Sequence, residues 1–298
     1  MRKFILLIVL SIAFSATSQN IKPYILGASA NGSIPEAKTT LKAALEESNF
    51  KIVGEYMPAK DANRWLIVVS HPALDKAVKT VGGLTGFASV LRVAITKENG
   101  TLNVSYTNPA YWGNAYFRDD YPKVETFYKL IDSDFTSAMS KFGQSKKVPF
   151  GSEKGESTEN LKEYHYMFGM PYFDETIELG QFSSNEAAVS KIDNSLKTGK
   201  PGLKLVYKYQ VPETGLVLYG IGLDGMNGEE LFMPIIDIDN PKHTAFLPYE
   251  ILVMNGEVHM LHGRYRIALS FPDLTMGTFT KIMSAPGDIE NALIQLVK

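Results

Sequence analysis

The chain of 298 residues carries 30 Lys and Arg, 32 Asp and Glu and no Cys, and its formal net charge at pH 7 is -2. Hydrophobic residues make up 45% and charged residues 21%, which is typical of a globular protein. The length suggests about two domains. The charge balance gives no sign of a nucleic-acid binder, and the lack of Cys excludes disulfides, thiolate catalysis and Cys-based metal sites.

Residues 1–18 have the pattern of a secretory signal. A short basic start precedes the apolar run Phe4–Phe14, and the small residues Ala16 and Ser18 follow it. The run is shorter than the roughly 20 apolar residues of a membrane-spanning helix, which disfavours an uncleaved membrane anchor. No later stretch of the sequence is apolar for long enough to span a membrane. We expect an exported protein, periplasmic or secreted, that begins at Gln19 and has no transmembrane segment.

The first half of the chain alternates strand and helix patterns. A helix is predicted after the capping box Ser33-Ile-Pro-Glu36, whose side chains satisfy free backbone N–H groups. A second helix is predicted to open at His71-Pro72, and an amphipathic helix ends at Phe142. Asn99-Gly100 predicts a hairpin turn. The predicted strands are Tyr24–Ala28, Phe50–Tyr56, Trp65–Ser70, Val90–Thr96 and Leu102–Thr107.

The stretch from Gly143 to Asn160 is rich in Gly, Ser, Lys and Glu and has few apolar residues. We expect a linker over residues 143–163, joining a domain at 19–142 to a second one at 164–298.

The second half repeats the plan of the first. It has a capping box at Ser183–Glu186, a hairpin at Asn255-Gly256 and a closing helix, and LKLVYKYQVP from Leu203 resembles FKIVGEYMP from Phe50. These parallels predict an internal duplication with one strand order in both halves, although two unrelated α+β domains would share some of them. The short loop Asp237–Phe246 is expected to replace the helix that follows His71. The predicted strands are Ile177–Phe182, Leu203–Val211, Leu216–Leu223, Glu250–Met254 and Glu257–Leu261.

The second half contains Asn240-Pro241-Lys242 and Leu247-Pro248-Tyr249-Glu250-Ile251, and the first half has weaker counterparts at His71-Pro72 and Phe87–Val93. In these motifs the chain resembles the domain of unknown function 302 family. Members of that family have Asn-Pro at the start of the second helix and Leu-Pro-Cys-Asn-Val at the start of the hairpin. Tyr249 stands where the family has Cys, so any role of that Cys is absent. The resemblance implies an α+β fold of two tandem units, each a curved, mainly antiparallel sheet with helices on one face, in a TATA-binding-protein-like arrangement. It implies no known reaction.

One glycine-rich pattern and one acid-rich pattern are interpreted as structural features and not as binding sites. Gly220-Ile-Gly222-Leu-Asp-Gly225 matches G-x-G-x-x-G, but a loop is expected after it instead of the helix that a dinucleotide site needs. The oxygens of Asp224, Asn227, Glu229 and Glu230 lack the spacing of a calcium loop, which favours a solvated turn.

Histidines give no clear metal site. His259 and His262 are three apart on a predicted strand and therefore point to opposite faces. Asp237, Asp239 and His243 are close in a loop and could hold a cation, although a capped turn is favoured. The sequence has no G-x-S-x-G, P-loop or H-E-x-x-H motif, so we expect no identifiable catalytic residue, no metal ligand and no cofactor.

The segment Tyr106–Phe117 (YTNPAYWGNAYF) is the most unusual stretch and is expected to be a loop. Tyr106, Trp112 and Tyr116 are the candidate aromatic walls of a ligand site, and Arg92 on the neighbouring strand is the candidate cation at its rim. In the alternative interpretation the rings cover the sheet edge and Arg92 forms a surface ion pair.

These observations favour a non-catalytic binding protein for a small apolar ligand or a partner protein. One alternative is a cell-envelope hydrolase that uses unidentified carboxylates. Another is a structural assembly in which the two units pair through their sheets. Nucleic acid is not an expected partner, and the sequence leaves a homodimer open.

Overall fold

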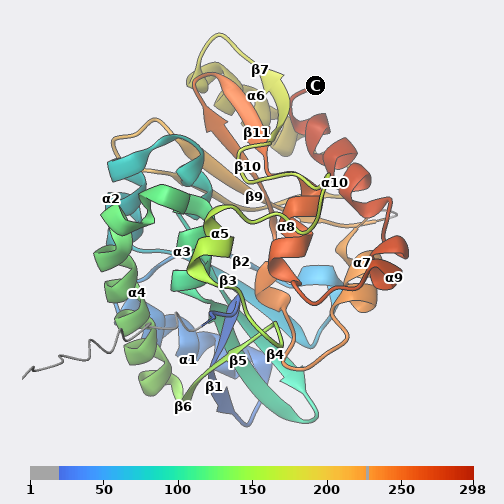
Figure 1. The fold of residues 1–298 in the computed structure, drawn as a ribbon. Coiled ribbons are helices and arrows are strands. Elements are labelled where there is room, and N and C mark those ends of the chain that lie inside the picture. The colour runs from blue at the N-terminus through green and yellow to red at the C-terminus, as the bar shows by residue number, and fades with distance from the viewer. Residues whose placement is uncertain (1–19, 226–227) are drawn as a thin grey trace, which may run out of the picture.

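The computed structural model describes residues 20–225 and 228–298, so the predicted signal and Gln19 lie outside the described residues. Two antiparallel sheets and their helices form an α+β fold (Figure 1). Within the described residues, no helix has both the length and the hydropathy that a membrane crossing requires.

The first unit contains a six-stranded sheet in the order β2-β3-β4-β5-β1-β6. Its strands are β1 (Tyr24–Ala30), β2 (Lys51–Tyr56), β3 (Arg64–Ser70), β4 (Leu91–Glu98), β5 (Thr101–Thr107) and β6 (Gln144–Phe150). Its helices are α1 (Ile34–Glu46), α2 (Pro72–Val81), α3 (Pro109–Phe117), α4 (Tyr121–Phe142) and α5 (Thr158–Lys162), with 3-10 turns η1 (Pro58–Lys60), η2 (Gly83–Ala88) and η3 (Arg118–Asp120).

The second unit contains a five-stranded sheet in the order β7-β11-β10-β9-β8. Its strands are β7 (Ile177–Gln181), β8 (Leu203–Gln210), β9 (Val217–Leu223), β10 (Tyr249–Met254) and β11 (Glu257–Met260). Its helices are α6 (Asn185–Thr198), α7 (Glu229–Ile236), α8 (Gly263–Ser270), α9 (Met276–Thr280) and α10 (Ala285–Leu293), with 3-10 turns η4 (Thr244–Phe246) and η5 (Ile294–Leu296).

The two units share one strand order, as an internal duplication predicts. Read from its other edge, the second sheet has the order β8-β9-β10-β11-β7, and β7 to β11 correspond in chain order to β1 to β5. The order is then the same as β2-β3-β4-β5-β1 in the first sheet, to which β6 adds one more strand. The likeness reaches local detail, because β2 and β8 carry a bulge at the equivalent residues Val53 and Val206. Both hairpins turn through a left-handed Asn-Gly pair, with φ of 49° at Asn99 and 54° at Asn255.

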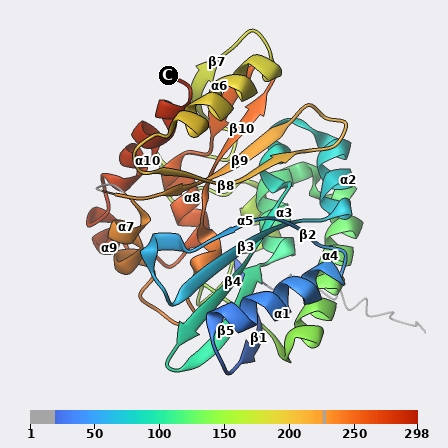
Figure 2. The ribbon, with the colours of Figure 1, turned by 180° about the vertical axis from the view of Figure 1, so that it is seen from behind.

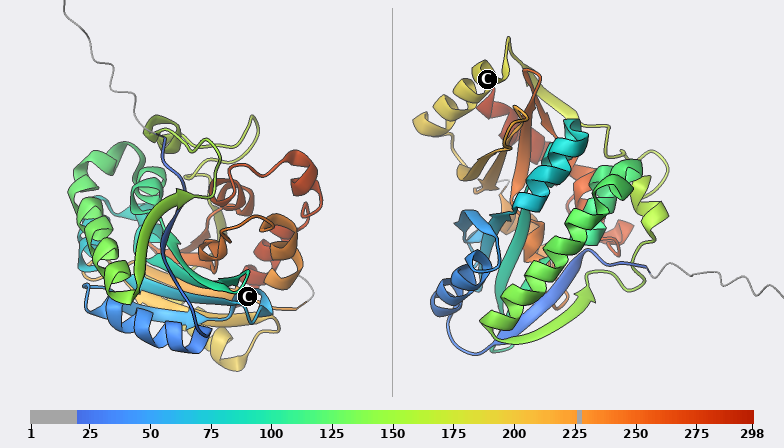
Figure 3. Two further views of the ribbon diagram at one scale, coloured as in Figure 1. Left: turned by 90° about the horizontal axis from the view of Figure 1, so that it is seen from below. Right: turned by 90° about the vertical axis from the view of Figure 1, so that its left-hand side faces the viewer.

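Helices cover one face of each sheet. In the first unit α1 and α4 contact the strands and α2 packs on α4; in the second, α6 and α10 contact the strands. Figure 2 shows α1 against the first sheet and α6 against the second, and Figure 3 shows α4 running along the first unit beside β1 and β6. The ring of Tyr106 stacks on Phe135 of α4 with centroids 4.2 Å apart, so the helix-covered face holds the core of the first unit.

The other face of each sheet is turned toward the other unit. The turn η2, just before β4, packs on β9 and β10, and the turn η4, just before β10, packs on β3, β4 and β5. The helices α3 and α8 are joined by a hydrogen bond, in which the Tyr111 hydroxyl donates to the Leu269 carbonyl over 2.9 Å. Each unit thus covers the sheet of the other.

The expected linker is wrong for much of its length. Residues 144–150 form β6, which pairs with β1 along the edge of the first sheet. Most side chains of β6 are exposed, and a strand exposed on both faces has the polar composition of a linker. Backbone hydrogen bonds to β1 hold β6 in the sheet, and the amino-acid composition gives no sign of such bonds.

Three further local predictions were wrong, in whole or in part. The aromatic segment contains α3, capped by Asn108 and opened by Pro109. Nearly every residue of α3 is buried, so no amphipathic period marks it. In the second unit residues 237–243 do form a loop, but this loop does not replace the helix that follows His71, because α7 precedes it in the equivalent place. The second capping box was predicted wrongly: the N-cap of α6 is Ser184, whose hydroxyl accepts the Ala187 N–H, and Ala187 at the third helical position has no carboxylate that could complete a box.

Candidate functional site

The candidate site is a pocket of about 360 Å³ between the two units, here called the seam pocket. The first unit lines it with the end of β6 and residues 151–152. The second unit lines it with the segment Ile236–His243, after α7, and with residues of the segment Phe271–Thr278, after α8. The pocket therefore exists only because the two units pack together.

Aromatic rings surround His243 at the floor of the seam pocket. The imidazole stacks on Phe271 with centroids 4.7 Å apart, and it lies 5.0 Å from the ring of Tyr24 and 5.7 Å from that of Phe150. Burial lowers the pKa of His243, although Asp237 opposes this effect, so the ring is neutral at pH 7. Its Nδ1 is buried and makes no hydrogen bond of good geometry among the described residues, although the Ser270 backbone is close enough to oppose the lowering of the pKa. The floor offers flat apolar contact and one nitrogen without a well-formed hydrogen bond.

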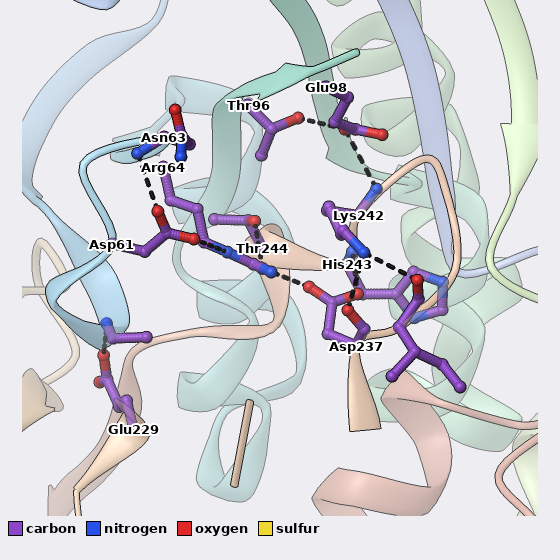
Figure 4. Close-up of polar contacts among 12 residues, drawn as sticks. Asp61, Asn63, Arg64, Thr96, Glu98, Glu229, Asp237, Lys242, His243 and Thr244 are labelled. Carbon is purple, nitrogen blue, oxygen red and sulfur yellow. Dashed lines mark hydrogen bonds and ion pairs between the residues drawn. The ribbon is translucent and has the colours of Figure 1, made fainter. Parts of the chain in front are cut away.

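Behind the floor, Asp237 joins the two units (Figure 4). Its carboxylate forms an ion pair with Arg64 of β3 and accepts the backbone N–H of His243 over 2.8 Å. Arg64 also donates to the Thr244 hydroxyl over 2.9 Å. The side chain of Asp237 is only 3% exposed, so its charge is used within the protein and is not offered to a ligand.

The loop that carries His243 is held by the first unit. The Lys242 ammonium closes the loop by donating to the carbonyls of Asp237 and Ile238 over 3.0 and 2.8 Å. The Lys242 backbone N–H donates to Glu98, at the end of β4, over 3.2 Å (Figure 4). These bonds fix the position of the loop, and with it that of the His243 ring.

The rim of the seam pocket is more negative than positive. Asp239 and Asp273 lie on it against one cation, Lys22. Asp273 accepts a hydrogen bond from the Ser152 hydroxyl over 3.1 Å, whereas Asp239 is exposed. Ile238, also on the rim, leaves 64% of its surface exposed. An apolar and an anionic surface therefore stand side by side at the mouth.

The four residues predicted from the sequence to bind a ligand do not line the seam pocket. Tyr106 pairs in register with Val93, so it lies on the face of the sheet opposite to Arg92. Trp112 is 3% exposed, donates from Nε1 to the Pro23 carbonyl over 2.9 Å, and contacts Tyr116 edge to face. Arg92 forms a buried ion pair, not a surface one. Ligand binding by these residues stays a prediction.

The cation hypothesis placed Asp237, Asp239 and His243 together, and all three do line the seam pocket. The described residues nevertheless contain no cluster of three or more acidic or histidine side chains able to hold a metal ion. The ion pair with Arg64 explains this for Asp237, since it already satisfies that carboxylate.

The acid-rich pattern around residue 224 serves the contact between units, and Asn227 lies outside the described residues. Glu229 accepts hydrogen bonds from the Tyr56 hydroxyl and the Ala59 N–H, both over 2.9 Å. Burial raises the pKa of Glu229 to about 7. The solvated turn expected here is wrong for Glu229, which is 1% exposed.

Two of the three glycines of G-x-G-x-x-G have a packing role. A Cβ at Gly220 would overlap the ring of Tyr207, and one at Gly222 would lie 3.0 Å from the ring of Tyr56. Tyr207 crosses β9 at this point and donates its hydroxyl to Glu250. The motif thus lets two tyrosines lie flat on β9.

Sequence reasoning missed most of the pocket wall. Phe150 falls in the expected linker, and Phe271 and Asp273 follow a helix, α8, that was not predicted. A signal was present, because His262 caps α8 as Asn108 caps α3 in the first unit, each accepting the N–H two residues later.

Comparison with known proteins gives a likeness among solved structures. No family model matches the chain, and no curated protein matches it. Among solved structures, the chain is similar to an uncharacterized conserved protein DUF302 from Bacillus stearothermophilus, with 13% sequence identity and a TM-score of 0.33. The match covers 39% of this chain and 97% of that one. The name of that protein is that of the family whose motifs the sequence resembles.

Proposed function

We propose that the chain is an exported, non-catalytic binding protein that holds a small organic ligand in the seam pocket. The observation that carries this proposal is the floor, where the neutral His243 ring is stacked among aromatic side chains and its buried Nδ1 makes no hydrogen bond of good geometry among the described residues. Pockets that bind small molecules combine apolar walls with a few polar groups that set orientation.

The lining favours an amphipathic ligand over a purely apolar one. A flat hydrocarbon or aromatic group fits against His243 and Phe271, and Ile238 offers further apolar contact. The excess of carboxylates at the rim favours a cationic group on the same ligand, placed toward Asp239. We therefore propose small aromatic amines as the ligand class.

The first experiment is native mass spectrometry of the mature protein, which detects a ligand retained through purification. Ligand-observed NMR then compares a set of small aromatic amines with the aromatic carboxylates of the same shape. We expect binding of the amines and little binding of the carboxylates.

Two variants locate that binding. Asp239→Asn should weaken amine binding about three- to fivefold, which is the effect of an exposed charge pair. Asp119→Asn, an exposed carboxylate on η3, is the matched control and should leave binding unchanged. A bare chain in the mass spectrum with no binding of either compound class would contradict the proposal, and so would equal effects of the two variants.

The hydrolase alternative has less support in the seam pocket. Acid–base hydrolysis needs two free carboxylates facing a cleft, but Asp237 is paired with Arg64, and Asp273 accepts from Ser152 and the Glu153 N–H. Turnover of a bound amine derivative that is lost in Asp239→Asn would favour the hydrolase.

A further inference from the structure

A second group of charged residues lies in the interior between the units and shares no residue with the seam pocket. Arg92 on β4 and Arg266 on α8 both form an ion pair with the same oxygen, Oε2, of Glu250 on β10. The exposed fractions of the three residues are 2%, 1% and 2%. Two buried guanidinium groups thus share one carboxylate, an arrangement with one excess positive charge.

Neighbouring carboxylates do not balance that charge through contact. Among the ion pairs of the described residues, Glu250 is the one acidic partner of Arg92 and Arg266. Asp237 is paired with Arg64, and Glu229 is bonded to Tyr56 and two backbone N–H groups. A buried charge without a counter-charge is strongly unfavourable.

Several hydrogen-bond donors of the same group are unused. The Nε atoms of Arg92 and Arg266 and the hydroxyl of Tyr116 are buried and have no hydrogen-bond partner in the part of the chain that the structure describes. Burial raises the pKa of Tyr116 to about 12, and the charges of Arg266 and Arg92 act to lower it. Buried polar groups nearly always have partners, so donors of this kind around an excess positive charge indicate an anion.

The orientation of Arg266 is fixed from the other side. Its Nη2 donates to the carbonyls of Phe246 and Pro248 over 2.6 and 2.7 Å, and its Nη1 donates to Glu250 over 2.8 Å. The Nε–H therefore cannot turn to a different acceptor without breaking these bonds. An anion can be held beside it by preorganised donors.

We propose that Arg92, Arg266 and Tyr116 bind one small monovalent anion of the size of chloride or formate. One excess positive charge calls for one negative charge, and we choose a small anion because all three residues are at most 2% exposed. Arg92 and Tyr116 belong to the first unit and Arg266 to the second, so the anion stabilises the packing of one unit on the other. This inference goes beyond the proposed function and does not depend on it.

Thermal unfolding in sodium chloride, sodium formate and sodium gluconate at equal concentration tests the proposal, since gluconate is too large for the site. We expect Tm to be higher by about 4 °C or more in chloride, in formate, or in both, than in gluconate. Co-crystals grown with bromide, or with formate if formate alone raises Tm, should show the anion in contact with Arg92 and Arg266.

Three variants keep the test specific. Arg92→Gln should abolish the difference between salts. Arg64→Gln removes another buried arginine from the contact between units, but one already paired with Asp237, so it should lower Tm and keep the difference. Tyr116→Phe removes only an unpartnered hydroxyl, so it should leave Tm in gluconate unchanged and reduce the gain in the other salts. Equal Tm of the wild type in all three salts, an equal loss of the response in Arg64→Gln, or crystals without the anion would overturn the proposal.

Discussion

Glu229 should make the stability of the protein fall as pH rises. Its carboxylate is sealed between α7, η1 and β9, where Tyr56, Ala59 and Leu223 donate to it. Burial raises its pKa from an ordinary 4.5 to about 7 in spite of these bonds. The folded protein therefore binds this proton more tightly than the unfolded chain, and stability decreases between the two pKa values.

The size of the effect follows from the shift. A change of one pKa unit corresponds to about 1.4 kcal/mol, so Glu229 should remove about 3 kcal/mol of unfolding free energy between pH 4 and pH 8. The stabilising contribution of the protonated form is complete below pH 4.5 and is lost as pH passes through 7. Glu229→Gln lacks the titration, so the stability of the variant relative to wild type should rise by that amount.

Urea unfolding at fixed ionic strength, at several pH values from 4 to 8, measures the difference between Glu229→Gln and wild type. Glu230→Gln is the matched control on the same turn. Burial alone would raise the pKa of Glu230, but Lys60 and the Gly225 N–H outweigh it and lower that pKa. The stabilising contribution of Glu230 is complete above its ordinary pKa of 4.5, so the stability difference between Glu230→Gln and wild type should stay level from pH 5 to pH 8. Parallel curves for wild type and Glu229→Gln would refute the argument.

Three further outcomes are expected. Trp112→Ala should lower the free energy of unfolding by about 3–5 kcal/mol, measured as a lower Tm, because the side chain is buried. The same variant should keep any ligand retained in the seam pocket. A small loss of stability together with loss of the ligand would indicate instead that Trp112 is part of the ligand site. Gly54→Ala should destabilise by about 1–3 kcal/mol in urea unfolding, because its Cβ would overlap the Val206 carbonyl oxygen of the other unit, whereas Gly287→Ala, with open space at Cβ, should be neutral or stabilising. N-terminal sequencing of exported material should begin at Gln19; a start at Met1 would contradict the predicted signal.

Most strands, helix starts and hairpin turns could be predicted from the sequence. Alternating and continuous apolar runs predicted strands close to the observed bounds, and the pair His71-Pro72 opens α2 as expected, with Nδ1 of His71 accepting the Ala73 N–H over 3.0 Å. The Asn-Gly pairs turn both hairpins. These features depend on neighbours within a few residues, so composition and spacing are enough to predict them.

Elements without a local signature were missed. The helix α3 is buried on all sides and has no amphipathic period, and β6 is exposed on both faces and has no apolar alternation. Each is ordered by what packs or pairs against it. The predicted duplication required one strand order in both units, but it did not show that each unit would cover the sheet of the other.

The candidate sites were decided by tertiary structure. The sequence singled out Arg92, but its partner Glu250 is 158 residues away, and the ion pair forms only when the two units pack. Asp237 and His243 were recognised as neighbours in a loop, while Arg64 and Phe150, which complete the seam pocket and its back wall, come from the other unit. Local sequence determined the strands, turns and caps because those follow from short-range backbone chemistry. Which charged side chains come together in the low-dielectric interior depends on long-range packing, so only the tertiary structure determines these pairs.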